Sequence, residues 1–317
     1  MISLRRLTLG FTDASVIGQM ESVLQTSIDG LLTGAVYGIA GVGFGFIYLV
    51  IRRLDLAYGA CLMAALYVVV ASAAPGQISV WLSLAIALPV TAAVMAYSQW
   101  LCFPVRLGRP PIAAVAASFA LWMQIEEVVT LFMPLHHYAF PADLTNKDVF
   151  FGSIAIRLDL AIVALLSIAT AVALLMFVWG TREGCALRAG AQNPVAAVLC
   201  GISPARLWIL TWLVSTILGT VAAISIAAIE RSVTPMLGLN LTLKALVVIA
   251  IGGTSTIHGP LLGGYILGLF EAHTQAAFGP QIREFATYVF LFFWLALRPP
   301  VLRWGLTSLI PIRRQLS

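Results

Sequence analysis

Long apolar segments alternate with short polar ones along the whole chain. Most of the apolar segments approach the ~20 residues that an α-helix needs to cross a bilayer. They predict membrane-spanning helices at 28–50, 57–73, 81–102, 112–131, 158–180, 207–229, 241–253, 259–277 and 284–297. The seventh and eighth are short, and glycines mark their junction. The segments lack the strict alternation of polar and apolar residues that is typical of a transmembrane barrel, so the pattern favours helices.

Composition narrows the class further. Hydrophobic residues make up 61% of the 317 residues and charged residues only 10%, which excludes a water-soluble domain. We therefore expect an all-α integral membrane protein with a single transmembrane domain over residues 1–317, built as a polytopic bundle of about eight or nine helices. The four cysteines lie singly and His136-His137 has no third ligand at useful spacing. We accordingly expect no metal site, no cofactor bound by this chain and no nucleic-acid partner.

The distribution of arginines predicts the orientation of the bundle. Eleven of the eighteen basic residues fall in loops on one side, namely Arg52, Arg53, Arg106, Arg109, Arg182, Arg188, Arg206, Arg298, Arg303, Arg313 and Arg314. Basic loops of membrane proteins collect on the cytoplasmic side. This predicts an outer N-terminus, a cytoplasmic C-terminus, a cytoplasmic loop at 181–206 and an outer loop at 132–157. Residues 16–28 are either an amphipathic helix on the outer surface or an N-terminal extension of the first span.

The cytoplasmic loop contains signals for a short, capped helix. Asn193 is a good N-cap, Pro194 suits the first helical position, and Gly201 can end the helix in the left-handed conformation. Ser203-Pro204 then repeats the start signal for the next span. A rigid helix between two spans predicts a docking element, and we assign it Arg188, Asn193, Pro194, Val195, Ala196, Ala197, Val198, Leu199 and Gly201.

Glycines repeat at helical spacing near both ends of the chain. They share the i, i+4 pattern that lets two helix backbones touch, and they are Gly30, Gly34, Gly38, Gly41, Gly45, Gly259, Gly263, Gly264 and Gly268. A polar cluster from Gly252 to Pro260 interrupts the apolar pattern between the seventh and eighth spans. It is either a broken helix that lines a transport path or a cytoplasmic hairpin that joins two short spans.

Few ionisable residues lie within the predicted spans, and each needs a partner, a cavity or a route to the membrane surface. We expect Lys244 to reach the outer surface with its long side chain and Glu271 to have a structural role, paired with Lys244 or with a neighbouring helix. Glu126 and Glu127 are adjacent, so at most one can face a given site. We predict that Glu126 faces inward, because it continues a polar stripe on its helix. The candidate path residues are Asp55, Tyr58, Ser118, Trp122, Glu126, Gly252, Gly253, Thr254 and Ser255.

Three segments together resemble a known family. They are GLLTGAVYGIAGVGFGFIYLVIRRLDLAYGACLMAALY at 30–67, RAGAQNPVAAVLCGI at 188–202 and LKALVVIAIGGTSTIHGPLLGGYILGLFEA at 243–272. In order and spacing the chain is similar, from about 24 to 305, to bacterial ABC-type permease subunits for branched-chain amino acids, a family shared with urea and short-amide permeases. The resemblance implies a second homologous permease, two cytoplasmic ATPases that carry ATP and Mg²⁺, and an extracytoplasmic solute-binding protein. It also implies that the helix at 193–199 is a coupling helix.

The chain departs from the family in two runs and has two rival interpretations. Gly252-Gly253-Thr254-Ser255-Thr256 stands where the family has Gly-Gly-x-Gly-Ser. Asp55-Leu56-Ala57-Tyr58-Gly59 stands where the family commonly has Asn-Phe-Ala-His-Gly, which leaves the solute open between a branched-chain or related amino acid and urea or a short amide. A secondary transporter would need coupling-ion carboxylates deep in the bundle, for which Glu126 is the main candidate. An intramembrane enzyme would need a catalytic constellation, and no such motif occurs in the sequence.

Overall fold

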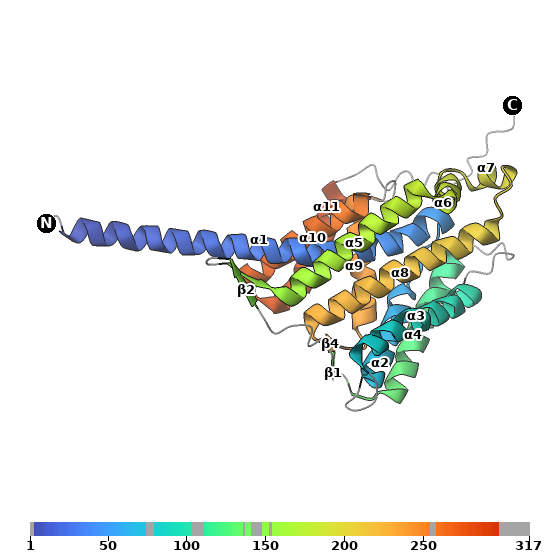
Figure 1. Ribbon diagram of the computed structural model, residues 1–317, viewed down its shortest axis with the longest axis horizontal. Helices are drawn as coiled ribbons and strands as arrows, with labels where there is room; N and C mark the ends of the chain where they lie inside the picture. The colour runs from blue at the N-terminus through green and yellow to red at the C-terminus, as the bar shows by residue number, and fades with distance from the viewer. Residues whose placement is uncertain are drawn as a thin grey trace.

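The computed structural model of the chain describes residues 3–73, 79–102, 111–135, 137–140, 148–151, 154–253 and 258–297. Within this part of the chain a helix covers each of the nine predicted spans (Figure 1). These helices are α1 (Ser3–Ile51), α2 (Tyr58–Ser72), α3 (Val80–Cys102), α4 (Pro111–Phe132), α5 (Leu158–Gly180), α8 (Pro204–Glu230), α9 (Leu237–Gly252), α10 (His258–Phe278) and α11 (Pro280–Leu297). The predicted all-α polytopic class is confirmed.

Length and hydropathy together separate these helices into groups. Five segments of the described chain are long and apolar enough to cross a membrane, namely Met20–Ile51, Leu82–Cys102, Ile112–Phe132, Leu158–Gly180 and Pro204–Glu230. The helices α2 and α9 are apolar but shorter. Residues 16–28 continue α1 without a break, so of the two alternatives the structure has the N-terminal extension. The first turns of α1 project well beyond the other helices in Figure 1.

The predicted outer loop contains short strands. Strand β1 (Tyr138–Ala139) pairs antiparallel with β4 (Ser232–Val233), so it ties the end of α4 to the end of α8. Strands β2 (Asp148–Phe151) and β3 (Ile154–Arg157) form an antiparallel hairpin that leads into α5.

The loop 181–206 holds two helices rather than the one predicted. The helix predicted from the capping signals is α7 (Pro194–Leu199), and an additional helix, α6 (Arg182–Gln192), precedes it. The hydroxyl of Thr181 caps α6 by accepting a 3.0 Å hydrogen bond from the Gly184 amide. Leu187 is buried beneath the helix. The sequence therefore contains a start signal for α6 at Thr181, but the polar composition of the helix itself is typical of a loop.

Helix α1 lies at the centre of the packing and contacts α5, α8, α9 and α10. Its glycines meet those of α10 at backbone distance. A Cβ atom placed on Gly34 would lie 2.9 Å from the Gly264 carbonyl oxygen, and one on Gly30 would lie 3.0 Å from that of Gly268. The two predicted glycine faces therefore pack against each other. This contact also places the polar residues of α1 opposite those of α10.

The remaining predicted packing glycines lie near α9. A Cβ atom on Gly45 would lie 3.1 Å from the Ile249 side chain, and one on Gly41 would meet Val248. On α10, a Cβ atom on Gly263 would lie 3.0 Å from the Gly252 amide nitrogen, and Gly259 packs against Gly252 and Gly253. Glycines therefore line the contacts of α9 with both α1 and α10.

Candidate functional site

The docking element predicted in the loop 181–206 stands at one end of the bundle (Figure 1). The Asn193 side chain accepts hydrogen bonds from the amides of Val195 and Ala196, both at 3.1 Å, and Pro194 occupies the first turn. Gly201 ends the turn with φ at 85°. The local capping signals thus produce a short helix whose position is fixed at both of its ends.

Only some of the residues assigned to the docking element form the outward face of α7. Val195 and Leu199 are 69% and 84% exposed, and Val198 lies on the same face, because the three residues have i, i+3, i+4 spacing. Ala197 is buried against the core and only Ala196 of the two alanines is exposed. The outward surface is therefore a patch of branched apolar side chains.

Two further contacts anchor this element to the membrane helices. The guanidinium of Arg188 lies 4.4 Å from the centroid of the Trp179 ring, which holds α6 against the end of α5. Arg206, at the start of α8, forms an ion pair with Glu183 of α6, with Nε and Oε2 3.1 Å apart. Arg188 thus has an anchoring position, whereas α7 presents the exposed patch.

Asp55 and Ser118, two of the predicted path residues, meet inside the bundle. Asp55 is 0% exposed and accepts hydrogen bonds from Gln99 Nε2 at 2.8 Å and from the Ala57 amide at 3.0 Å. Ser118 accepts one from the Leu56 amide at 3.1 Å. These bonds close a compact polar cluster around the link between α1 and α2, so the two side chains are held in the packed core.

Tyr58 is also in the packed core, whereas Trp122 and Glu126 lie nearer the surface of α4. Tyr58 is fully buried, and its hydroxyl donates to the Ser215 carbonyl oxygen at 3.4 Å. Trp122 and Glu126 are half-buried on one face of α4, and Glu127 is exposed. The predicted polar stripe therefore points partly inward, with Ser118 as its most buried member.

The Gly252–Pro260 cluster has the geometry of a helical hairpin. Helix α9 ends at Gly252, Gly253 has φ at 79°, and α10 begins at His258. Thr254 and Ser255, which we had assigned to the path, lie outside the described residues. Because Gly252 packs against both Gly259 and Gly263, the chain turns back on itself at this point.

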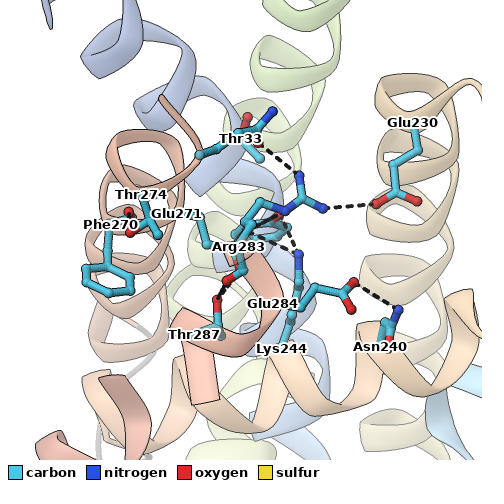
Figure 2. A network of polar contacts seen from close by, with 12 residues as sticks. Thr33, Glu230, Asn240, Lys244, Phe270, Glu271, Thr274, Arg283, Glu284 and Thr287 are labelled. Carbon is cyan, nitrogen blue, oxygen red and sulfur yellow. Dashed lines mark hydrogen bonds and ion pairs between the residues drawn. The ribbon is translucent and has the colours of Figure 1, made fainter. Parts of the chain in front are cut away.

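A buried ionic network lies at the other end of these helices (Figure 2). Lys244 Nζ is 3.1 Å from Glu271 Oε2 and donates to the Tyr37 hydroxyl at 2.9 Å. Tyr37 in turn donates to Glu271 at 2.8 Å, and Thr287 donates to the other carboxylate oxygen at 2.8 Å. Lys244 is only 6% exposed, so the prediction that it reaches the membrane surface is wrong; the alternative pairing with Glu271 is what the structure shows.

Arg283 extends the network towards solvent. Its guanidinium lies 3.7 Å from Glu271 and 3.6 Å from Glu230, and it donates to Gln275 at 3.4 Å. Figure 2 shows Arg283 between Glu230 on one side and Glu271 with Lys244 on the other. These distances are longer than those around Lys244, so Arg283 is held loosely by two acids.

The network forms one wall of a cavity of about 520 Å³. The charged and hydroxyl-bearing residues that line it come from five elements, and they are Thr26, Asp29, Thr33, Tyr37, Arg157, Glu230, Glu271 and Arg283. Glu230 is the last residue of α8, a helix that starts directly after the docking element, so the cavity lies at the end of the bundle opposite α7. No sequence motif marks four of these residues, because they lie among apolar or loop residues. They are Asp29, Tyr37, Arg157 and Arg283.

The fold and these features define a multi-pass membrane protein with an exposed apolar patch at one end and a charged cavity at the other. Comparison with known proteins assigns it further. The model of the family described as branched-chain amino acid transport system permease component matches residues 27–297. The chain therefore belongs to this family of ABC-type permeases, which confirms the resemblance noted in the sequence.

Individual relatives agree with this assignment. The chain is 25% identical over 290 residues to the high-affinity branched-chain amino acid transport system permease protein LivH of Escherichia coli K12, over 87% of this chain and 94% of that protein. It is 26% identical over 292 residues to BraD, the permease protein of the corresponding system of Pseudomonas aeruginosa, with the same coverage. Among solved structures, a chain of PsaBC from Streptococcus pneumoniae in complex with Fab shares the fold, with a TM-score of 0.51 and 15% identity over 86% of this chain and 91% of that one.

Proposed function

We propose that this chain is the transmembrane permease subunit of an ATP-driven importer that moves a branched-chain or related amino acid across the bacterial inner membrane. Membership of the permease family supports this proposal, together with names of relatives that specify branched-chain amino acid transport. The chain itself acts as a conduit and not as an enzyme, and ATP and Mg²⁺ are bound by two separate cytoplasmic ATPase subunits.

The observation that carries the coupling part of the proposal is the exposed patch on α7. Val195, Val198 and Leu199 form an apolar surface on a short helix that is capped at both ends and anchored through α6. An exposed apolar patch next to fixed backbone is suited to a protein cleft. In this proposal α7 inserts into a groove of one ATPase, and a second homologous permease brings the other ATPase.

The proposed orientation follows from the same end of the molecule. The link between α1 and α2 carries Arg52 and Arg53, and the docking element carries Arg182, Arg188 and Arg206. An excess of arginine is typical of the cytoplasmic side. We therefore place α7 and the C-terminus in the cytoplasm and the N-terminus outside, where an extracytoplasmic binding protein delivers the solute.

The departure from the family at Asp55 and Tyr58 does not argue against an amino acid solute. Both side chains are fully buried and hydrogen-bonded within the packed core. Neither lines the cavity at the opposite end. In this proposal the exchange therefore concerns how α2 packs against α1, α3 and α8, and other residues choose the solute.

Reconstitution tests the proposal. The chain is purified with its partner permease and ATPases, placed in liposomes and supplied with the binding protein. We expect ATP-dependent accumulation of radiolabelled L-leucine or a related amino acid, with excess urea or acetamide having no effect. As a control, an ATPase subunit that cannot hydrolyse ATP should abolish uptake. Uptake without ATP would contradict the coupling. If only urea or acetamide competed, the chain would instead be a permease for urea or a short amide.

A further inference from the structure

The cavity opposite α7 is built from helix faces and not from loops alone. On α1 the lining residues Thr26, Asp29, Thr33 and Tyr37 recur at helical spacing, so they lie on one face. Ile226, Ile229 and Glu230 do the same on α8. Because the glycine contacts fix α1 against α10, the relative position of these walls is set by backbone packing. A volume of about 520 Å³ falls in the range of sites for small ligands.

The cavity wall carries charges of both signs. Glu271 is occupied by Lys244, Tyr37 and Thr287 at hydrogen-bond distance, so its charge is neutralised within the wall. Asp29 differs, since among the described residues no hydrogen bond or ion pair reaches its carboxylate, although the cation of Arg157 is close enough to act on it electrostatically. An acid that is half-buried and lacks a bonded partner favours a positively charged ligand group.

Of the two cations that line the cavity, Arg283 is the one available to an anionic group. Arg283 holds Glu230 and Glu271 only at 3.6 and 3.7 Å, beyond normal hydrogen-bond length. A carboxylate that entered the cavity could replace these loose contacts by two parallel N–H···O bonds, which is the geometry that guanidinium groups prefer. Arg157, the other cation of the lining, is already held by Asp159, with Nη2 and Oδ2 2.7 Å apart, so it contributes its positive charge to the wall and not a free donor pair.

The rest of the lining is mostly apolar, with Thr26, Thr33 and Gln275 as its neutral polar side chains. Leu160 of α5 and Ile226 and Ile229 of α8 face the cavity, as do Ala272 and Ala276 of α10. These side chains can hold an aliphatic group but offer no hydrogen bond to a uniformly polar ligand. The cavity thus combines an acidic position, a cationic position and an aliphatic surface.

We propose that this cavity binds a small zwitterionic solute, an amino acid with an aliphatic side chain, within the permease itself. Asp29 and Glu230 receive the ammonium group, Arg283 receives the carboxylate, and Leu160, Ile226 and Ile229 contact the side chain. The assignment rests on the proposed transport function and adds to it the location of a solute site. Binding replaces the two long contacts of Arg283 with Glu230 and Glu271 by ion pairs to the ligand, and it leaves the charge of the wall unchanged because a zwitterion has no net charge.

The first test is direct binding to the assembled complex in lipid nanodiscs without the binding protein. Radiolabelled L-leucine should bind saturably, and Asp29→Asn and Glu230→Gln should each weaken binding about tenfold or more. Isoamylamine and 4-methylvalerate, which lack the carboxylate and the amine respectively, should compete poorly. Glu284→Gln is the matched control, because Glu284 bonds to Asn240 and does not line the cavity. Absence of saturable binding to the wild-type complex, or wild-type affinity in both variants, would overturn the proposal.

The second test does not depend on changing a charge. Cysteine is introduced at Ala276, which lines the cavity, or at the adjacent Ala277, which is exposed and does not, in a chain whose Cys185 and Cys200 are serine. L-leucine should slow modification of Ala276→Cys by a cationic thiol reagent and leave that of Ala277→Cys unchanged. Equal rates with and without L-leucine at both positions would contradict a site here. ATP-dependent uptake that persists in such a case would show that the transport function stands and only the cavity assignment fails.

Discussion

Lys244 of α9 donates a 2.9 Å hydrogen bond to the hydroxyl of Tyr37 on α1, although 207 positions separate the two residues. Both groups also contact Glu271 of α10, at 3.1 and 2.8 Å. Three helices are therefore joined by one buried charge pair and a phenol. A buried ion pair adds little stability compared with apolar residues, but breaking it leaves an uncompensated charge.

The first prediction follows from that asymmetry. Lys244→Met should destabilise the bundle by about 3–5 kcal/mol, because Glu271 then remains buried without its closest cation. Lys244→Met combined with Glu271→Met should cost less than the sum of the two single variants. Thermal unfolding of the purified variants in lipid nanodiscs measures this coupling as a double-mutant cycle. Strictly additive losses would show that the pair is not an energetic unit.

The second prediction concerns the contact of α1 with α10. Gly34→Ala places a Cβ atom 2.9 Å from the Gly264 carbonyl oxygen, so the helices must separate or shift. We expect a loss of about 1–3 kcal/mol, the usual cost of overpacking, and a reduced yield of assembled complex. Gly180→Ala provides the control, since a Cβ atom there meets nothing within 4 Å. Equal melting temperatures for the two variants would mean that the interhelical contact has no energetic weight.

The third prediction concerns the exposed patch on α7. Leu199→Glu or Val195→Glu should reduce ATPase co-purification and ATP-dependent uptake about tenfold, the effect of about 1.4 kcal/mol on an association, while the membrane bundle stays folded. These positions are preferable to Ala197, which is buried, so that a change there would also disturb the loop itself. Asn193→Ala tests the cap separately and should cost about 1 kcal/mol of local stability. Full co-purification in both charged variants would remove α7 from its proposed role.

The fourth prediction separates the two adjacent acids of α4. Glu126 is half-buried in line with Trp122 and Ser118, whereas Glu127 is exposed. Glu126→Gln should therefore impair uptake without impairing folding, because it retains the shape and loses the charge of an inward group, and Glu127→Gln should leave both unchanged. Uptake is normalised to the amount of assembled complex. A defect confined to Glu127→Gln would place the functional face of α4 one residue away.

Local signals predicted a large part of this molecule. Apolar length predicted a helix at each of the nine segments, and five of these helices are long and apolar enough to cross a membrane, since whether a segment of about 20 residues enters a bilayer depends on its own composition. Helix α7 was predicted from Asn193, Pro194 and Gly201, because a cap is formed between residues a few positions apart. The second helix of the same loop, α6, had a comparable cap at Thr181 but was hidden by its polar composition.

Tertiary structure alone decided which residues meet and where the cavity lies. The partner of Lys244 depends on the alignment of α1 with α10. The cavity depends on the rotation of α1, α8 and α10, since one face of each helix must point towards it. In a soluble protein the apolar face of a helix indicates its inner side, but in a membrane both the lipid and the core are apolar. The sequence by itself therefore determined the positions of the nine apolar helices and of the short helix α7, but not the presence of α6. The rotation of each helix about its axis was fixed only by packing.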